Sequence, residues 1–199
     1  MEYLIVMLPL LGAIISGFFS KLIGTKQCQL ITSSFVSISG ILSLYIFYQV
    51  IFNDYYSNKI IFNWITSGNF NVNWSINIDP LTSVMLVIVS LISSIIHFYS
   101  IGYMSHDPHK SRFMSYLSLF TFSMLTLVTA DNFLQLYFGW EGVGLCSYLL
   151  IGFWYKKPSA NAAAIKAFLV NRVGDFGFAI GIFLIFFFYG TVNYNEVFQ

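Results

Sequence analysis

The stretch Leu81–Met104, which reads LTSVMLVIVSLISSIIHFYSIGYM, decides the fold class of this chain. It contains no aspartate, glutamate, lysine or arginine. A helix needs about 20 consecutive, mostly apolar residues to cross the hydrocarbon core of a bilayer. The stretch therefore predicts a membrane-spanning helix rather than a strand or the core helix of a soluble domain.

Five further apolar runs surround this stretch, and together the six runs predict an all-α polytopic membrane protein with about six transmembrane helices. The five runs cover Leu4–Ile23, Leu30–Phe52, Phe113–Ala130, Phe133–Phe153 and Asn161–Tyr189. We divide the chain into an N-terminal three-helix membrane segment, residues 1–112, and a second segment, residues 113–199, that contains helices four to six.

The composition excludes several classes of protein. Of the 199 residues, 57% are hydrophobic, 20% are aromatic and only 9% are charged, with a formal net charge of +1. Soluble domains carry about 25% charged residues. A soluble globular enzyme, a disordered chain and a nucleic-acid binder are therefore excluded.

The sequence also lacks the common cofactor and metal motifs. Cys28 and Cys146 lie in apolar surroundings without CxxC spacing, so we expect buried free thiols. No Cys/His cluster suits zinc or an iron–sulfur centre, and no glycine-rich loop suits a nucleotide. We therefore expect this chain to bind no metal, NADH or ATP directly.

The segment between the second and third runs predicts a small β-hairpin over about residues 60–78. Residues 60–65 are strand-like, residues 66–69 have turn chemistry, and residues 71–78 alternate polar and apolar side chains. We expect this hairpin to lie on the non-cytoplasmic surface. Pro80 follows it and suits the first position of the third transmembrane helix.

The loops differ in charge, which predicts the orientation of the helices. Six cations lie in the first, third and fifth loops: Lys21, Lys26, Lys110, Arg112, Lys156 and Lys157. The loops and termini on the other side of the predicted membrane contain one cation, Lys59. The positive-inside rule then places the odd-numbered loops in the cytoplasm and both termini on the opposite side.

Several ionisable residues lie inside the apolar runs, and Glu141 is one of them. It lies about eight residues into the fifth run, or roughly 12 Å along a helix. A charge at the centre of a bilayer costs about 2.5–3.5 kcal/mol on insertion scales. Poor solvation favours the protonated carboxyl unless a cation lies close, so Glu141 is a candidate for proton exchange. The alternative is a hydrogen-bonded carboxylic acid that only joins helices.

Three more charges lie in the sixth run, and one histidine lies in the third. Arg172 and Asp175 are spaced i, i+3, so they can face each other as a static or a functional ion pair. Lys166 falls roughly on the opposite face of the same helix. It needs a partner elsewhere, or it extends to the cytoplasmic edge of the membrane. His97 is either a proton relay or a simply hydrogen-bonded imidazole.

Glycines cluster near these charges. Small residues let transmembrane helices approach closely, and glycines can also expose the backbone to water. The two clusters are Gly139, Gly142 and Gly144 in the fifth run, and Gly174, Gly177 and Gly181 in the sixth.

Two long stretches carry a resemblance to a known family. They are Asp131–Phe153, DNFLQLYFGWEGVGLCSYLLIGF, and Ala164–Phe178, AIKAFLVNRVGDFGF. Both resemble the antiporter-like subunits of respiratory complex I, in particular subunit L, also called subunit 5. The predicted hairpin with Asp79–Thr82 and the stretch His97–Met104 fit the same family, and the resemblance covers about residues 60–192.

The resemblance implies a function and roles for specific residues. Complex I couples NADH oxidation by quinone to proton pumping, and this family forms the distal pumping module of its membrane arm. In the family, the glutamate matching Glu141 pairs with a lysine on a seventh helix, and Lys166 matches a lysine of the sixth helix. Arg172 and Asp175 match an ion pair that opens and closes near the glutamate. His97 is the weakest candidate for a proton-transfer role.

The resemblance also implies the protein's surroundings. The chain is expected to be a non-redox subunit of a translocase, whose NADH, FMN, iron–sulfur clusters and quinone are bound by other subunits. The expected partners are the other membrane-arm subunits and the lipid bilayer, with no nucleic acid. The expected location is the inner membrane of a bacterial cell or a mitochondrion.

Family members continue into a seventh helix with its lysine, and residues 113–199 match only the start of the first antiporter-like repeat. Two alternatives therefore stay open. One is the large subunit of a multisubunit cation/proton antiporter. The other is a truncated or split product that acts only as a membrane scaffold.

Overall fold

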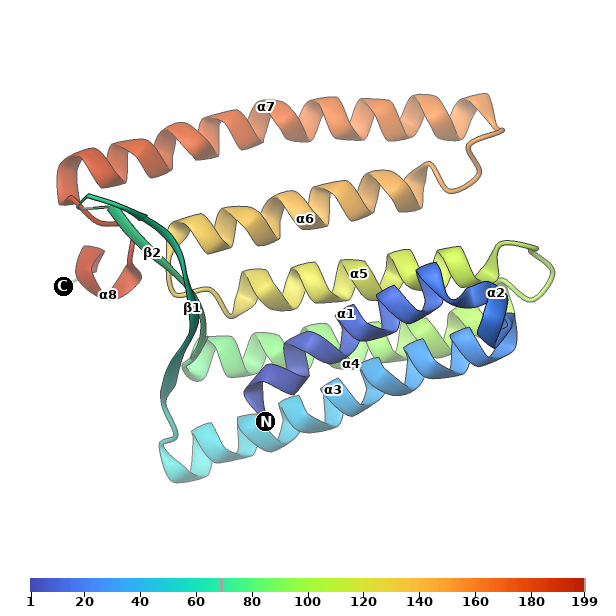
Figure 1. Cartoon of the computed structure of the whole chain (residues 1–199), viewed down its shortest axis with the longest axis horizontal. Coiled ribbons are helices and arrows are strands. Elements are labelled where there is room, and N and C mark those ends of the chain that lie inside the picture. The colour runs from blue at the N-terminus through green and yellow to red at the C-terminus, as the bar shows by residue number, and fades with distance from the viewer. Residues whose placement is uncertain (69, 199) are drawn as a thin grey trace. The chain divides into compact units, whose positions relative to one another are not determined.

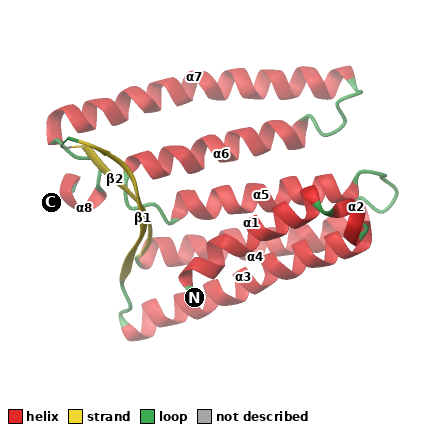
Figure 2. Ribbon diagram, viewed as in Figure 1, coloured by secondary structure: helices red, strands yellow, loops and turns green. Residues whose placement is uncertain are grey.

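The computed structural model describes residues 1–68 and 70–198, and most of them are helical (Figure 1). Figure 2 shows the same elements coloured by type, with helices in red and strands in yellow. The helices are α1 (Glu2–Phe18), α2 (Ser20–Ile23), α3 (Thr25–Asn53), α4 (Pro80–Tyr103), α5 (Lys110–Val128), α6 (Phe133–Ile151), α7 (Pro158–Tyr189) and α8 (Tyr194–Val197). The strands are β1 (Ser57–Ser67) and β2 (Phe70–Ile78).

The second to sixth predicted apolar runs lie mainly on the long helices α3 to α7, in chain order, whereas the first run, Leu4–Ile23, is divided between α1 and the short helix α2. Three of these, α3, α4 and α7, are long and apolar enough to cross a membrane, and α1 is a shorter apolar helix. Helices α5 and α6 have 19 residues each, which corresponds to about 28 Å of helix. The prediction of a mostly helical membrane chain is confirmed.

Several helices begin before their apolar runs, and α3 and α7 show why. Helix α3 begins at Thr25 and includes the polar pair Lys26 and Gln27, because a helix can continue past the hydrocarbon without an apolar sequence. Helix α7 begins at Pro158, whose fixed φ suits the first turn and whose missing N–H costs no helical hydrogen bond there.

The chain packs as two compact units. The first contains Met1–Tyr55 and Pro80–Leu125, and the second contains the described residues of Tyr56–Asp79 and Thr126–Gln199. The division predicted at residue 112 concerns the order of helices along the chain rather than their packing, and it stays a prediction.

Small polar residues join the helices of the first unit. Ser39 Oγ donates to the carbonyl of Ile5 at 2.7 Å, which ties α3 to α1. The hydroxyls of Ser37 and Ser94 share a hydrogen bond of 2.8 Å between α3 and α4. Serine allows a close approach of helices, and its hydroxyl finds an acceptor without water.

Contacts at the two ends of the first unit group its loops. The Tyr55 hydroxyl donates to the Glu2 carboxylate, so the end of α3 lies beside the start of α1. At the other end, Ser16 Oγ donates to the carbonyl of Ser111 at 2.8 Å, so the end of α1 lies beside the start of α5. The cations of this unit's first and third loops belong to the second end: Lys21, Lys26, Lys110 and Arg112.

The second unit contains the β-hairpin. Strand β1 pairs antiparallel with β2, from Ser57 opposite Ile78 to Ser67 opposite Phe70, with two register shifts between. A small two-stranded sheet therefore occupies the segment where the hairpin over about residues 60–78 is predicted, and its place on the non-cytoplasmic surface stays a prediction. The predicted turn includes Gly68, whose φ of +58° favours glycine, and Asn69, which lies outside the described residues.

The hairpin is fixed to the start of α6 by buried side-chain amides. Gln135 Oε1 accepts from the backbone N–H of Ser75 at 2.9 Å, and Gln135 Nε2 donates to the Ser75 carbonyl at 2.8 Å. Asn132 caps α6 by accepting from the Gln135 N–H, and its Nδ2 donates to the carbonyl of Asn73 at 2.9 Å. The capping residue of α6 therefore also holds the hairpin.

Large apolar side chains remain exposed on α7. Val173, Phe183 and Phe187 are examples, each more than two-thirds exposed. Soluble monomers rarely leave contiguous apolar surfaces of this kind uncovered. The exposed face of α7 is therefore suited to lipid or to another apolar helix.

Candidate functional site on helices α6 and α7

An ion pair joins α6 to α7 at the position of the predicted site. Arg172 Nη1 lies 2.6 Å from both Oε1 and Oε2 of Glu141 and donates to the carboxylate. The Glu141 side chain is 24% exposed and that of Arg172 is 50% exposed. The carboxylate is therefore better shielded than its cation.

Aromatic side chains support both members of this pair. The Tyr137 hydroxyl, one helical turn before Glu141, donates to Glu141 Oε1 at 2.8 Å. The guanidinium of Arg172 lies over the ring of Phe168, 4.9 Å from its centroid, in a cation–π contact. Glu141 thus keeps one neutral hydrogen-bond donor on its own helix in addition to the cation from α7.

Asp175 has a different partner from the one predicted. It is buried, with 6% of its surface exposed, and its Oδ1 accepts from the indole Nε1 of Trp140 at 2.9 Å. The ring of Phe178 meets Trp140 nearly edge-on, with centroids 6.0 Å apart. Asp175 is therefore an acceptor enclosed by aromatic rings.

The described structure does not form the i, i+3 pair of Arg172 with Asp175, and that pairing stays a prediction. The two residues are one turn apart on α7, but Arg172 binds Glu141 and Asp175 binds Trp140. Both side chains point to partners on α6 because the α6–α7 packing offers each one a partner there. A spacing rule shows which side chains share a face, but it does not show which partners the neighbouring helix supplies.

Neither Lys166 nor His97 is a hydrogen-bond or ion-pair partner of Glu141 or Arg172 among the described residues. Lys166 is exposed on α7 and forms no hydrogen bond or ion pair within the described part of the chain. His97 is fully buried on α4 in the first unit. Its Nδ1 lies 2.8 Å from the Ser93 carbonyl and its Nε2 lies 3.0 Å from Ser118 Oγ. Both ring nitrogens therefore have partners, as the hydrogen-bonded alternative expects.

Among the glycines near the predicted charges, Gly139 lies at a close approach of two helices. A Cβ added there would lie 2.7 Å from Leu127 N, Cα and Cβ, so α6 approaches the backbone of α5 closely at this point. An added Cβ at Gly144, Gly174 or Gly177 would meet no atom within 4 Å. Close packing of helices therefore explains Gly139, two residues before Glu141, and does not explain these three.

The sequence did not identify Tyr137, Trp140 and Phe168 as parts of the site. A usable signal was present, since Tyr137 precedes Glu141 by four residues and Phe168 precedes Arg172 by four, which places each pair on one helix face. Cys28 and Cys146 are free and buried, as predicted. Within residues 1–68 and 70–198, no group of three His, Cys, Asp or Glu side chains could hold a metal.

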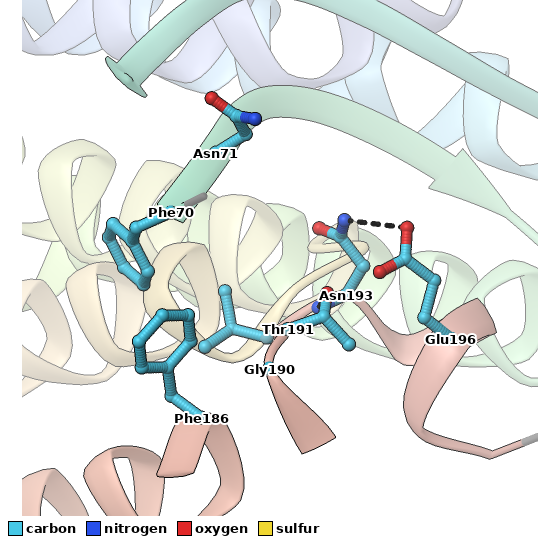
Figure 3. Close-up of a pocket in the computed structure, with 8 residues that line it drawn as sticks. Phe70, Asn71, Phe186, Gly190, Thr191, Asn193 and Glu196 are labelled. Atoms are coloured by element: carbon cyan, nitrogen blue, oxygen red, sulfur yellow. Dashed lines mark hydrogen bonds between the residues drawn. The ribbon is translucent and has the colours of Figure 1, made fainter. Parts of the chain in front are cut away.

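A small hollow of about 120 Å³ lies where β2 meets the end of α7 in the second unit (Figure 3). The ring of Phe70 meets that of Phe186 edge-on, with centroids 4.9 Å apart. Asn193 Nδ2 lies 3.4 Å from Glu196 Oε1 across the hollow. Helix α7 ends here at Gly190, whose φ of +71° suits a helix C-terminus.

The chain returns to the start of α6 just after this hollow. The Phe133 N–H donates to the carbonyl of Val192 at 3.0 Å, and the Tyr194 N–H donates to the carbonyl of Asp131 at 3.0 Å. Burial, with the nearby Asp131 carboxylate, raises the pKa of the Tyr194 hydroxyl well above its ordinary value. These contacts gather the hairpin, the α5–α6 turn and the C-terminal segment at one end of the second unit.

Comparison with known proteins gives the relatives of this chain. Residues 64–114 match the family described as "NADH-Ubiquinone oxidoreductase (complex I), chain 5 N-terminus". Residues 130–199 match the family described as "NADH:quinone oxidoreductase/Mrp antiporter, TM". The NADH-quinone oxidoreductase subunit L of Rickettsia felis is 55% identical over 196 residues, which are 98% of this chain. The chain resembles the N-terminal part of complex I subunit L.

The mitochondrial counterpart of subunit L gives the same result. The NADH-ubiquinone oxidoreductase chain 5 of Triticum aestivum is 54% identical over 198 residues, or 100% of this chain. The chain spans about 30% of the length of each of these two relatives.

A solved structure of a relative agrees with the fold. The structure of the Mrp complex from Dietzia sp. DQ12-45-1b contains a chain that matches with a TM-score of 0.82 and 25% identity. The match covers 98% of the present chain and 20% of that one. This chain is therefore similar to that chain of the Mrp complex in fold as well as in sequence.

Proposed function

We propose that this chain is the N-terminal part of a proton-translocating membrane-arm subunit of NADH:quinone oxidoreductase. The observation that carries the proposal is the identity of 54–55% to subunit L and chain 5 over 98–100% of the chain. In this proposal NADH, FMN, the iron–sulfur clusters and quinone are bound by other subunits. The membrane-arm partners are neighbouring subunits of the same complex.

Glu141 is proposed to exchange the translocated proton, and Arg172 to control that exchange. A carboxylate in a poorly solvated place binds a proton more readily when its counter-ion moves away, and it releases the proton when the cation returns. Arg172 is half exposed and is held by Glu141 and the face of Phe168, which gives it a route to leave. Tyr137 keeps the carboxyl oriented in both states.

Asp175 is the proposed alternative partner of Arg172. It lies three residues further along α7 and is held by a neutral donor, the indole of Trp140, rather than by a cation. A rotation of the arginine side chain along its own helix would exchange Glu141 for Asp175. Lys166 and His97 are proposed as further proton carriers. For His97, the Ser93 hydroxyl lies 3.4 Å from Nδ1 and the Ser118 hydroxyl 3.0 Å from Nε2, and each hydroxyl can give or accept a proton.

The proposed topology has six spans, α1 and α3 to α7, with both termini on the non-cytoplasmic side. Contacts within each unit support this orientation. In the first unit the Ser16–Ser111 contact groups the cationic loops, and in the second the hairpin and C-terminal segment gather at the end of α6 away from Lys156 and Lys157. Helices α5 and α6 are included as spans because of their length.

The large subunit of a cation/proton antiporter is a second candidate function. The observation in its favour is the likeness to the Mrp complex chain, with a TM-score of 0.82. The identity of 25% to that chain is less than half of the identity to subunit L. A scaffold without transport activity is the third reading.

Isolation of the tagged chain from its native membranes tests the proposal. We expect it to co-purify with NADH:quinone oxidoreductase activity. After reconstitution into vesicles, the addition of NADH and quinone should change the pH inside the vesicles. Sodium-dependent proton exchange without NADH oxidation would support the antiporter instead. If deletion of the chain changes neither the oxidoreductase activity nor the proton yield, the scaffold without transport activity is the remaining interpretation.

A further inference from the structure

An apolar groove lies between α4 and α5 in the first unit. Its volume is about 230 Å³, and it is open on one side. Its walls include Ile88, Ile92 and Ile96 on α4, and Leu117, Phe120 and Met124 on α5. The wall residues recur every three to four positions on each helix, so the groove follows both helix axes.

The few polar atoms of the groove already have partners within the protein. The hydroxyls of Ser93 and Thr121 share a hydrogen bond, and Thr121 also donates to the carbonyl of Leu117 at 3.0 Å. Because these hydroxyls are satisfied, a polar ligand would gain nothing there to offset its own loss of hydration. The groove therefore suits a purely hydrocarbon occupant.

The two helix faces that form the groove continue to the cationic end of the unit. On α5, Lys110 lies seven residues before Leu117, so it falls on the same face at a distance of about 10 Å along the axis. On α4, Tyr99 and Tyr103 lie seven residues after Ile92 and Ile96. These two tyrosines are exposed and stacked, with ring centroids 5.9 Å apart. Tyrosine is enriched at the headgroup level of a membrane.

Charge at this end favours an anionic headgroup. Lys110 Nζ donates to the carbonyl of Ser105, and an ammonium group has two further donors for a phosphate. The segment from residue 105 to residue 112 carries two cations and two histidines against one aspartate: Lys110, Arg112, His106, His109 and Asp107. An acyl chain in the groove would place its headgroup near these cations.

We propose that the α4–α5 groove binds one acyl chain of an anionic phospholipid, with the phosphate at Lys110. The site combines a dry hydrocarbon slot, an aromatic pair at headgroup height and a cation on the same helix face. A zwitterionic phospholipid could enter the slot, but it would gain less from the cation. The proposal goes beyond proton translocation and requires only that α4 and α5 lie in a membrane.

Photolabelling of the full chain in lipid nanodiscs tests this site. The nanodiscs contain phosphatidylcholine with a minority of phosphatidylglycerol, and either lipid in turn carries a photoreactive acyl chain at the same trace amount. We expect the phosphatidylglycerol probe to label residues 88–96 and 117–124 about fivefold more than the phosphatidylcholine probe, since one lysine near an anionic lipid contributes about that factor. Mass spectrometry of the labelled peptides gives the ratio.

Two lysine variants separate a specific site from general surface charge. Lys110→Gln is expected to remove the preference for phosphatidylglycerol at these residues. Lys26→Gln removes a cation from the same end of the unit but from α3, and it should leave the preference intact. Ile92→Trp should fill the groove and abolish labelling by both probes. The comparison of the two lipids on the unmodified chain remains a test even where a variant does not fold.

The contradicting outcomes are equally distinct. Equal labelling by both probes would show that the groove contacts bulk lipid without preference. The same conclusion would follow if both lysine variants lost the preference for phosphatidylglycerol to the same extent. Absence of label from residues 88–96 and 117–124, with label elsewhere on the chain, would show that protein covers the groove.

Discussion

Replacement of Gly139 by alanine tests the closest backbone approach near the proposed proton site. The new Cβ would lie 2.7 Å from Leu127 N, Cα and Cβ. Two of these atoms belong to the backbone of α5, so no side-chain rotation relieves the overlap. The helices must separate at the turn that carries Glu141, or the alanine must be accommodated under strain.

Gly144→Ala is the matched control on the same helix, because an added Cβ there meets no atom within 4 Å. Alanine is favoured over glycine in a helix by about 1 kcal/mol, and this gain applies to both variants. Overpacking costs typically about 1–3 kcal/mol, and this loss applies to Gly139→Ala alone. The difference between the two variants is therefore expected to be about 1–3 kcal/mol, with Gly139→Ala the less stable.

Thermal unfolding of both variants in the same detergent measures this difference. A chain of this size shifts its midpoint by about 2–4 °C per kcal/mol, so Gly139→Ala should unfold about 2–12 °C below Gly144→Ala. Equal midpoints would refute the close approach of α6 to the α5 backbone. A lower midpoint for Gly144→Ala would also refute it, since the open position should then be the crowded one.

Three further substitutions test other parts of the structure. Gln135→Leu should cost about 2–4 kcal/mol in thermal unfolding, because it leaves the N–H and C=O of Ser75 buried without partners; unchanged stability would contradict the clamp between the hairpin and α6. His97→Leu should lower the unfolding midpoint by removing partners on both sides of the ring, and it should lower the proton yield because His97 is a proposed proton carrier; a wild-type proton yield would contradict that role. Tyr137→Phe should lower the rate of proton pumping in the assembled complex without preventing assembly, because Glu141 loses its neutral donor; a wild-type rate would show that this hydroxyl has no part in proton exchange.

The long helices and the hairpin follow from local sequence patterns. An apolar run of about 20 residues has few alternatives to a helix, as at Leu81–Met104. The alternation over residues 71–78 similarly determines a strand. Pro80 marks the start of α4, as predicted. These features depend on neighbours along the chain, so the sequence alone is sufficient to predict them.

The partners within the site depend on how α6 and α7 pack, and the sequence does not contain that directly. Spacing allowed Arg172 to pair with Asp175, yet Glu141 and Trp140 supply the partners. The glycines show the same limit. All six occur near charges in the sequence, but a tight backbone contact explains Gly139 and leaves Gly144, Gly174 and Gly177 without a packing role.

The proton-to-electron ratio of the assembled complex in proteoliposomes tests the central claim most directly, namely that Glu141 exchanges the proton controlled by Arg172. The variant is Glu141→Gln, and Glu196→Gln, which removes a carboxylate from the short helix α8, is the control. We expect Glu141→Gln to lower the number of protons moved per NADH oxidised, while Glu196→Gln keeps the wild-type ratio. A wild-type ratio in Glu141→Gln, with the subunit present in the complex, would contradict the claim.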